Sequence, residues 1–168
     1  MNCVEEEYVY LALQHCECGG ELKTDGQALR NENDRPEDVL STCCLKCGKK
    51  SELCFDISAF YGDLSKYGMI IHPSKIIDAL EWLTLSVLFI REAEPKDNDD
   101  KKMMLGQASF CLDQLLMFYP EGADLPRDES FFNQPDGKLP EERADLFRRE
   151  RIAMLKKQTR DSSVKKEE

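Results

Sequence analysis

Five of the eight cysteines lie in two short clusters, HCECGG at residues 15–20 and CCLKCG at residues 43–48. Cysteine thiolates bind zinc, form disulfides and carry redox chemistry, so these clusters hold the clearest chemistry in the sequence. A glycine follows each cysteine pair and lets the chain turn tightly, so that backbone amides point at the sulfurs. About 25 residues separate the two pairs. Two close pairs from distant parts of a chain are typical of a tetrahedral metal site.

The surroundings of the cysteines favour a metal over the other thiol chemistries. The N-terminal residues MNCVEEEYVY are acidic and unlike a signal peptide, and the longest apolar stretch, residues 83–90, is too short to span a bilayer. We therefore expect a cytoplasmic protein, in which thiols stay reduced and disulfides are rare. A redox-active CxxC pair usually starts a helix, whereas residues 44–47 lie between two expected strands. An iron–sulfur cluster, which also takes four cysteines, is a further alternative.

The two pairs resemble the zinc-ribbon family over roughly residues 7–60, about a third of the chain. CLKCG at residues 44–48 matches the CxxCG turn, or knuckle, of that family, and CECG at residues 16–19 is a tighter CxCG form. The resemblance implies a small three-stranded sheet held by one structural zinc. The ligands that it implies are Cys16, Cys18, Cys44 and Cys47. A site with four thiolates has no open coordination position, which favours a structural zinc over a catalytic one.

The short first knuckle leaves two alternative ligand sets open. His15 lies three residues before Cys18, so it is a rival to Cys16 as the fourth ligand. Cys43 is a rival to Cys44, with an unusual three-residue gap before Cys47. Both alternatives keep the metal site between the same two parts of the chain.

The remaining cysteines and histidine are expected to be structural. Cys54 alternates into the segment SELCFDIS and is predicted to be a small buried residue, and Cys111 falls on the apolar stripe of a helix. Cys3 lies near the chain end, and His72 precedes a proline at an expected helix start. The sequence contains no GxSxG, HExxH, P-loop or glycine-rich dinucleotide motif, so it predicts no enzyme.

Three segments around the clusters have the composition of strands. Residues 7–16, rich in Tyr, Val and Leu, predict the first strand, and a second begins over residues 21–23. Residues 24–38 are polar and predict a loop with one extended piece, before residues 39–43 lead into the second cluster. The alternating residues 51–58 predict the last strand, in which Asp56 is expected to hold a turn or to cap a neighbouring segment.

The second half of the chain has helical periodicity. Ser74 is predicted to cap a helix that runs to about Ala93, and a second apolar stripe runs from Met104 to Phe118 before Pro120. A short polar connection joins the two helices, which favours an antiparallel hairpin. Residues 120–140 are predicted to be irregular, with Phe131 and Phe132 in the core. A third helix is expected from about Pro140 to Lys157.

These elements predict an α+β fold, an N-terminal three-stranded zinc ribbon packed with a C-terminal three-helix part. The expected domains are a zinc ribbon over residues 1–62 and a helical domain over residues 63–158, followed by a disordered tail over residues 159–168.

The charge of the chain constrains its partners. The net charge is −10, but residues 143–168 hold nine Lys and Arg against five Asp and Glu, a balance of +4, which leaves −14 on residues 1–142. An acidic body argues against a main role in gripping phosphate backbones. We therefore expect a non-enzymatic zinc-binding protein that docks on a protein partner. The alternative, a nucleic-acid-associated zinc-ribbon factor, finds support in the basic end and in Lys46, Lys49 and Lys50.

Overall fold

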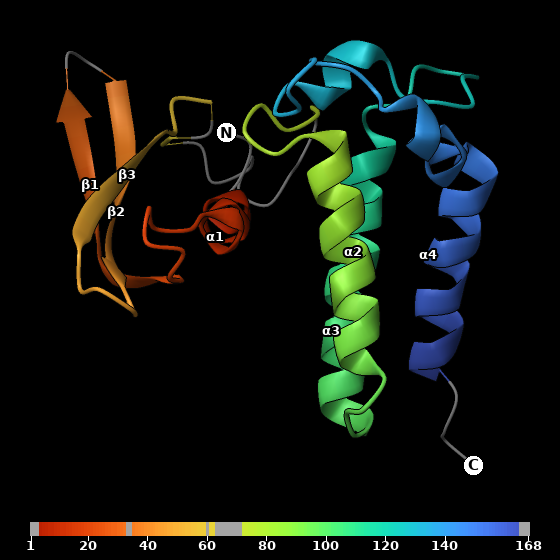
Figure 1. Ribbon diagram of the computed structural model, residues 1–168, viewed down its shortest axis with the longest axis horizontal. Coiled ribbons are helices and arrows are strands. Elements are labelled where there is room, and N and C mark those ends of the chain that lie inside the picture. Colours follow the sequence, from red (N-terminus) through yellow and green to blue (C-terminus); the bar gives the residue numbers. More distant parts are fainter. Residues whose placement is uncertain (1–3, 33–34, 60, 63–71, 165–168) are drawn as a thin grey trace. The chain divides into compact units, whose positions relative to one another are not determined.

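The computed structural model describes residues 4–32, 35–59, 61–62 and 72–164 of the chain (Figure 1). The chain divides into two compact units, Met1–Ile76 and Ile77–Glu168. The first unit contains a helix and a three-stranded antiparallel sheet, and the elements of the second are all helical within its described residues, 77–164. The mixed α+β class predicted from the sequence is therefore confirmed.

The sheet of the first unit has the strand order β1-β2-β3. Strands β1 (Leu22–Glu32) and β2 (Arg35–Cys44) pair antiparallel along almost their whole lengths, and β3 (Lys50–Asp56) pairs with the other side of β2. The predicted loop over residues 24–38 is therefore wrong. Strand β1 has no recognisable strand pattern in the sequence, because it is an edge strand. Its residues 25–31 are exposed, so apolar and polar residues do not need to alternate there. The strand predicted over residues 51–58 is confirmed as β3.

One face of the sheet holds the core of the first unit. In β2, Asp38, Leu40, Thr42 and Cys44 alternate onto this face and are buried. Leu40 lies opposite Leu53 and packs with Phe55 and with Leu11 of the preceding helix. Cys44 is the last residue of β2 and the last of these inward-facing residues, so its side chain points to the core side of the sheet where the knuckle begins.

The predicted strand over residues 7–16 is wrong, because residues 7–13 belong to helix α1 (Val4–Leu13). The buried residues Glu7 and Leu11 lie four positions apart, which is the spacing of one helix face. The strand preference of Tyr and Val depends on context, and here tertiary packing decides the structure. Tyr10 packs edge-on against Phe55, with ring centroids 5.8 Å apart.

The second unit is built on the hairpin of α2 (Ala79–Ala93) and α3 (Asn98–Leu116). Trp82 is fully buried between them and meets Phe110 edge-on, with ring centroids 6.0 Å apart. Cys111 of α3 is 1% exposed, which confirms its predicted place in the core. The two apolar stripes read from the sequence therefore meet each other, as expected for consecutive antiparallel helices.

The predicted cap of α2 at Ser74 is wrong, because Asp78 caps this helix. Asp78 accepts a hydrogen bond from the Glu81 amide, and the Glu81 carboxylate accepts one from the Asp78 amide, which is a capping box. The second carboxylate oxygen of the fully buried Asp78 accepts hydrogen bonds from the Asn133 amide and the Gln134 side chain. Asp78 therefore fixes both the start of α2 and the segment after the short helix η2 (Asp128–Phe131).

The predicted third helix is two elements, the 3-10 helix η3 (Glu141–Phe147) and helix α4 (Arg149–Val164). The chain is extended at Arg148, with ψ 130°, and the Arg149 amide donates to the Asp124 carbonyl instead of continuing a helix. The Arg149 guanidinium also donates to the carbonyls of Ala123 and Pro120. These contacts with residues 120–124 interrupt the helix that the sequence pattern predicts. The segment expected to be disordered from residue 159 is helical to Val164, and residues 165–168 lie outside the described residues.

Three smaller predictions have mixed outcomes. Phe131 is fully buried as predicted, but Phe132 is 39% exposed and is not in the core. Cys54 is exposed rather than buried, because it lies on the face of β3 turned away from the core residues Leu53 and Phe55, the outer face of the sheet. Val39, which lies opposite Cys54 on β2, is nevertheless buried. Asp56 holds a turn as predicted, since its carboxylate accepts hydrogen bonds from the amide and hydroxyl of Ser58. Cys3 and Phe60 lie outside the described residues.

The Asp78 cap generates a prediction about stability. Asp78→Ala leaves the buried donors of Glu81, Asn133 and Gln134 without their acceptor, so we expect a loss of about 2–4 kcal/mol in the free energy of unfolding. Urea denaturation followed by circular dichroism measures this loss. Glu81→Gln is the matched control because glutamine keeps an acceptor oxygen for the Asp78 amide. Equal stability of the two variants would contradict the role of Asp78.

The stability of the Glu81→Gln variant relative to the parent protein should depend on pH. Burial, the largest cause, raises the pKa of Glu81 above its ordinary value of 4.5. The neutral carboxyl of Glu81 is therefore favoured in the folded state. Its contribution to the stability of the parent protein is lost as the pH rises through the pKa of the folded state. We expect Glu81→Gln, which does not titrate, to gain stability relative to the parent as the pH rises above 4.5.

Candidate metal centre

The second knuckle begins where β2 ends and returns the chain to β3. The Cys44 amide donates to the Lys49 carbonyl at 2.9 Å, and the Gly48 amide donates to the Cys44 carbonyl at 2.9 Å. Gly48 has φ +72°, a conformation that favours glycine. This backbone places the side chains of Cys44 and Cys47 on the same side of the turn.

The first knuckle repeats this hydrogen-bond pattern with one residue fewer. The Cys16 amide donates to the Gly20 carbonyl at 2.9 Å, and the Gly19 amide donates to the Cys16 carbonyl at 2.7 Å. Gly19 has φ +73°, almost the value of Gly48. The closing bond spans three residues here and four in the second knuckle, so a tighter turn accommodates the missing residue. The CxCG spacing therefore still presents two sulfurs on one side.

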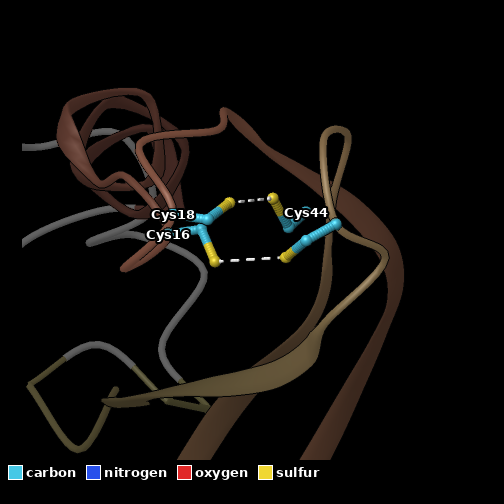
Figure 2. A group of neighbouring side chains, drawn as sticks. Cys16, Cys18 and Cys44 are labelled. Carbon is cyan, nitrogen blue, oxygen red and sulfur yellow. Dashed lines mark hydrogen bonds between the residues drawn. The ribbon is translucent and has the colours of Figure 1, made fainter.

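The four cysteine sulfurs of the two knuckles converge on one point. Their Sγ atoms all lie within 4.8 Å of one another. Figure 2 shows Cys16 and Cys18 of the first knuckle facing Cys44 of the second. Cys16 Sγ lies 3.6 Å from Cys47 Sγ, and Cys18 Sγ lies 3.5 Å from Cys44 Sγ. A tetrahedral zinc with thiolate ligands at about 2.3 Å separates its sulfurs by about 3.8 Å. The observed contacts are near that edge length and far above the bond length of a disulfide, about 2.05 Å.

Gly20 allows the knuckles to approach this closely. A Cβ atom on Gly20 would lie 2.6 Å from the Cβ of Lys46 and 2.7 Å from Cys44 Sγ, distances that real Cβ contacts do not show. The glycine pair of the first cluster thus has two separate roles. Gly19 supplies the turn conformation, and Gly20 makes room for the opposite knuckle. The sequence signals the first role through the knuckle motif, but only the packing of the two knuckles reveals the second.

Backbone hydrogen bonds and contacts between the sulfurs shift the pKa values of two thiols in the cluster. The amide of Cys47, followed by that of Lys46, hydrogen-bonds to the Cys44 sulfur and lowers the pKa of this thiol to about 6. The pKa of Cys18 is raised to about 12, first because its sulfur shares a proton with that of Cys47. The cluster therefore combines a thiol whose pKa is lowered, Cys44, with a thiol whose pKa is raised, Cys18. A bound cation would displace the protons of the thiols, so metal affinity should fall in acid.

Lysine side chains surround the cluster and lie in defined contacts. The Lys46 ammonium donates to the Cys18 carbonyl at 3.0 Å, and the Lys49 ammonium pairs with Glu17 at 2.9 Å. The pKa of Lys49 is raised, mainly by Glu17 and to a smaller extent by Cys16 and Cys47. These positive charges favour a site that concentrates thiolate charge at the surface of the first unit.

The two alternative ligands are not part of the convergent group. Among the residues that the structure describes, the residues that could hold a metal together are Cys16, Cys18, Cys44 and Cys47. His15 pairs with Glu21 in an isolated β-bridge that closes the base of the first knuckle. The Cys43 sulfur lies 3.7 Å from the Gly48 carbonyl oxygen, and this residue occupies the opposite face of β2 from Cys44. The geometry therefore favours the four-cysteine set over both alternatives.

Comparisons with protein-family models, with curated protein sequences and with solved structures find no match to this chain. The case for a metal centre therefore rests on the geometry and chemistry of the cysteine cluster. Within the described part of the chain, no helix combines the length and the apolar character needed to cross a membrane.

Gly20 provides a direct test of the packing between the knuckles. We expect Gly20→Ala to weaken zinc binding about 10- to 100-fold or more, because the new methyl group forces the two cysteine pairs apart. Competition with a chromogenic chelator measures this change. Gly106→Ala in α3 is the matched control, because its added Cβ meets no atom within 4 Å. Unchanged zinc affinity in Gly20→Ala would show that the close approach is not required.

Proposed function

We propose that Cys16, Cys18, Cys44 and Cys47 bind one zinc ion that stabilises a zinc-ribbon-like unit over residues 1–76. The observation that carries this proposal is the convergence of four thiol sulfurs within 4.8 Å. Soft thiolate ligands in a tetrahedral arrangement suit zinc, and the separation of the sulfurs fits a single ion. An iron–sulfur cluster is less compatible, because several metal ions and sulfides have to fit between the same four sulfurs.

The zinc would have a structural role. Four protein thiolates complete the coordination sphere and leave no position for a substrate or a catalytic water. The buried cluster of the first unit is small, consisting of Leu11, Leu40 and Phe55 with partly buried neighbours. A zinc that ties the chain after α1 to the β2–β3 turn would add a long-range constraint to this small core. Its binding free energy would then contribute to folding.

The protein would act as a non-enzymatic interaction protein. With a net charge of −10, its surface suits a protein partner better than a phosphate backbone. The three ribbon lysines that could favour nucleic acid lie in intramolecular contacts. Lys46 contacts the Cys18 carbonyl, Lys49 pairs with Glu17, and Lys50 pairs with Asp25 at 2.8 Å. The nucleic-acid-associated alternative therefore relies mainly on the basic residues of α4.

Elemental analysis of protein purified without added metal tests the zinc proposal. We expect about one zinc per chain in the parent protein, and loss of that zinc in Cys44→Ser. Cys54→Ser is the matched control, because Cys54 is exposed on the outer face of the sheet. Cys43→Ser and His15→Ala should also keep the metal, since neither residue joins the convergent group. Iron in place of zinc, or a metal-free protein that stays folded, would contradict the proposal.

Removing the metal should affect the two units differently. A strong chelator is expected to increase amide hydrogen exchange in β2 while α3 keeps its protection, because the cysteines belong to the first unit. Mass spectrometry of hydrogen exchange resolves the two segments. Equal loss of protection in β2 and α3 would mean that the metal stabilises the whole chain.

The nucleic-acid alternative has its own test. We expect labelled single-stranded RNA and duplex DNA to bind no more tightly than about 100 µM at physiological salt, the weak end of nonspecific binding. Fluorescence polarisation across a salt series measures this affinity. Micromolar binding that falls steeply as salt is added would instead favour the nucleic-acid-associated role.

A further inference from the structure

The sulfur contacts of the candidate metal centre join one knuckle to the other. Cys16 Sγ lies 3.6 Å from Cys47 Sγ, and Cys18 Sγ lies 3.5 Å from Cys44 Sγ. We call these the cross-knuckle pairs, and together they use each of the four sulfurs once. The two sulfurs of a pair would have to approach by about 1.5 Å to reach the length of a disulfide bond, about 2.05 Å.

Pairing within each knuckle suits the chain less well. A single residue, Glu17, separates the cysteines of the first knuckle, so a disulfide between them closes a very small ring, which strains the bond. A disulfide within the second knuckle would leave Cys16 and Cys18 to form that ring. Pairing across the knuckles avoids it.

Hydrogen bonds that involve no sulfur also join the two knuckles. The Leu45 amide donates to the Glu21 carbonyl at 2.9 Å, and the Lys46 ammonium donates to the Cys18 carbonyl at 3.0 Å. Both bonds run from the second knuckle to the first cysteine cluster and its neighbour in the chain. Because these bonds need no metal, they keep the cross-knuckle pairs opposite each other while the sulfurs change their chemical state.

The two cross-knuckle pairs differ in their access to solvent. Cys47 is exposed and Cys16 is partly buried, whereas Cys44 is only 1% exposed. A dissolved oxidant therefore reaches Cys47 before Cys44. We expect the disulfide between Cys47 and Cys16 to form first.

We propose that the cysteine cluster is a redox site, in which a peroxide converts the four thiols into two cross-knuckle disulfides, Cys16–Cys47 and Cys18–Cys44. The inference rests on the proposed zinc site and gives it a regulation, because each disulfide removes two ligands from the metal. Two remaining thiolates are too few for a tetrahedral site, so oxidation releases the zinc.

The chemistry needs one hydrogen peroxide for each disulfide. The Cys47 sulfur attacks one peroxide oxygen and the O–O bond breaks, which leaves a sulfenic acid on Cys47 and one water. The Cys16 sulfur then attacks the Cys47 sulfur, an S–S bond forms, the S–O bond breaks, and the oxygen leaves as a second water. The two sulfurs lose two electrons in total, and the protons come from the thiols or, for metal-bound thiolates, from solvent.

The disulfides connect the same two segments that the zinc would connect. Each closes a loop of about 30 residues, which restrains the unfolded chain. The first unit should therefore stay folded when oxidation removes the metal, whereas a chelator removes the metal and leaves no such restraint.

Peptide mapping of the full-length, zinc-loaded protein tests the pairing after treatment with about two equivalents of hydrogen peroxide. Trypsin and a glutamate-specific protease together separate the four cysteines into peptides 8–17, 18–21, 38–46 and 47–49. Without reduction, we expect mass spectrometry to find peptide 8–17 joined to peptide 47–49. Peptide 18–21 should be joined to peptide 38–46. Cys43→Ser is the matched control, because Cys43 shares a peptide with Cys44, and it should give the same two joined pairs.

Zinc release and amide exchange test the consequence of oxidation. A chromogenic zinc indicator should detect about one zinc per chain after the first equivalent of peroxide, and dithiothreitol should restore zinc binding. Amide hydrogen exchange in β2 should be slower in the oxidised protein than in reduced protein treated with a chelator. The zinc content of untreated protein tests the zinc proposal separately, and the disulfides can be mapped on metal-free protein as well. Either proposal can therefore fail while the other holds.

Three results would overturn the redox proposal. The first is any other pairing of the four peptides, such as peptide 38–46 joined to peptide 47–49. The second is cysteines that stay reduced, or that are recovered as sulfinic acids without disulfides. The third is equal exchange in β2 for the oxidised protein and the chelated, reduced protein.

Discussion

The first unit depends on the close approach of two cysteine knuckles at Gly20. A side chain at this position would overlap Lys46 and Cys44, so the two pairs of sulfurs meet only because the residue is glycine. The approach joins the end of α1 to the β2–β3 turn, two segments that are far apart in the chain. The sheet fixes the orientation of the second knuckle. Cys44 is the last residue of β2 and lies on its buried face, so its side chain points inward where the knuckle begins.

The second unit is organised by a buried carboxylate rather than by thiols. Asp78 ends the non-helical chain, starts α2 and holds the segment around Asn133, all through neutral hydrogen-bond donors. The buried side of α2 then packs on α3 around Trp82. These two contacts use one side and one end of α2.

The sequence predicts the candidate site better than it predicts the elements around it. The four cysteines follow from the resemblance of the two knuckles to a zinc ribbon, because the knuckle motif is local and its chemistry is specific, although the spacing left His15 and Cys43 open as alternatives. The secondary structure near the site is less predictable. Residues 7–16 have strand composition, but residues 7–13 belong to helix α1. Residues 24–38 have loop composition, but residues 24–32 lie in β1 and residues 35–38 in β2. In both segments the deciding factor is the partner surface, a core face for α1 and the ladder with β2 for β1.

The sequence by itself determined which thiols were available, the α+β class, the antiparallel pair of apolar helix stripes and the burial of Cys111 and Phe131. These features depend on residue type and on periodicity over a few turns. The tertiary structure alone decided that Cys16 rather than His15 joins the group, that Gly20 must be glycine and that Asn133 and Gln134 donate hydrogen bonds to Asp78. Each of these depends on atoms from distant segments meeting within a few ångströms, and local sequence patterns contain no information about such meetings.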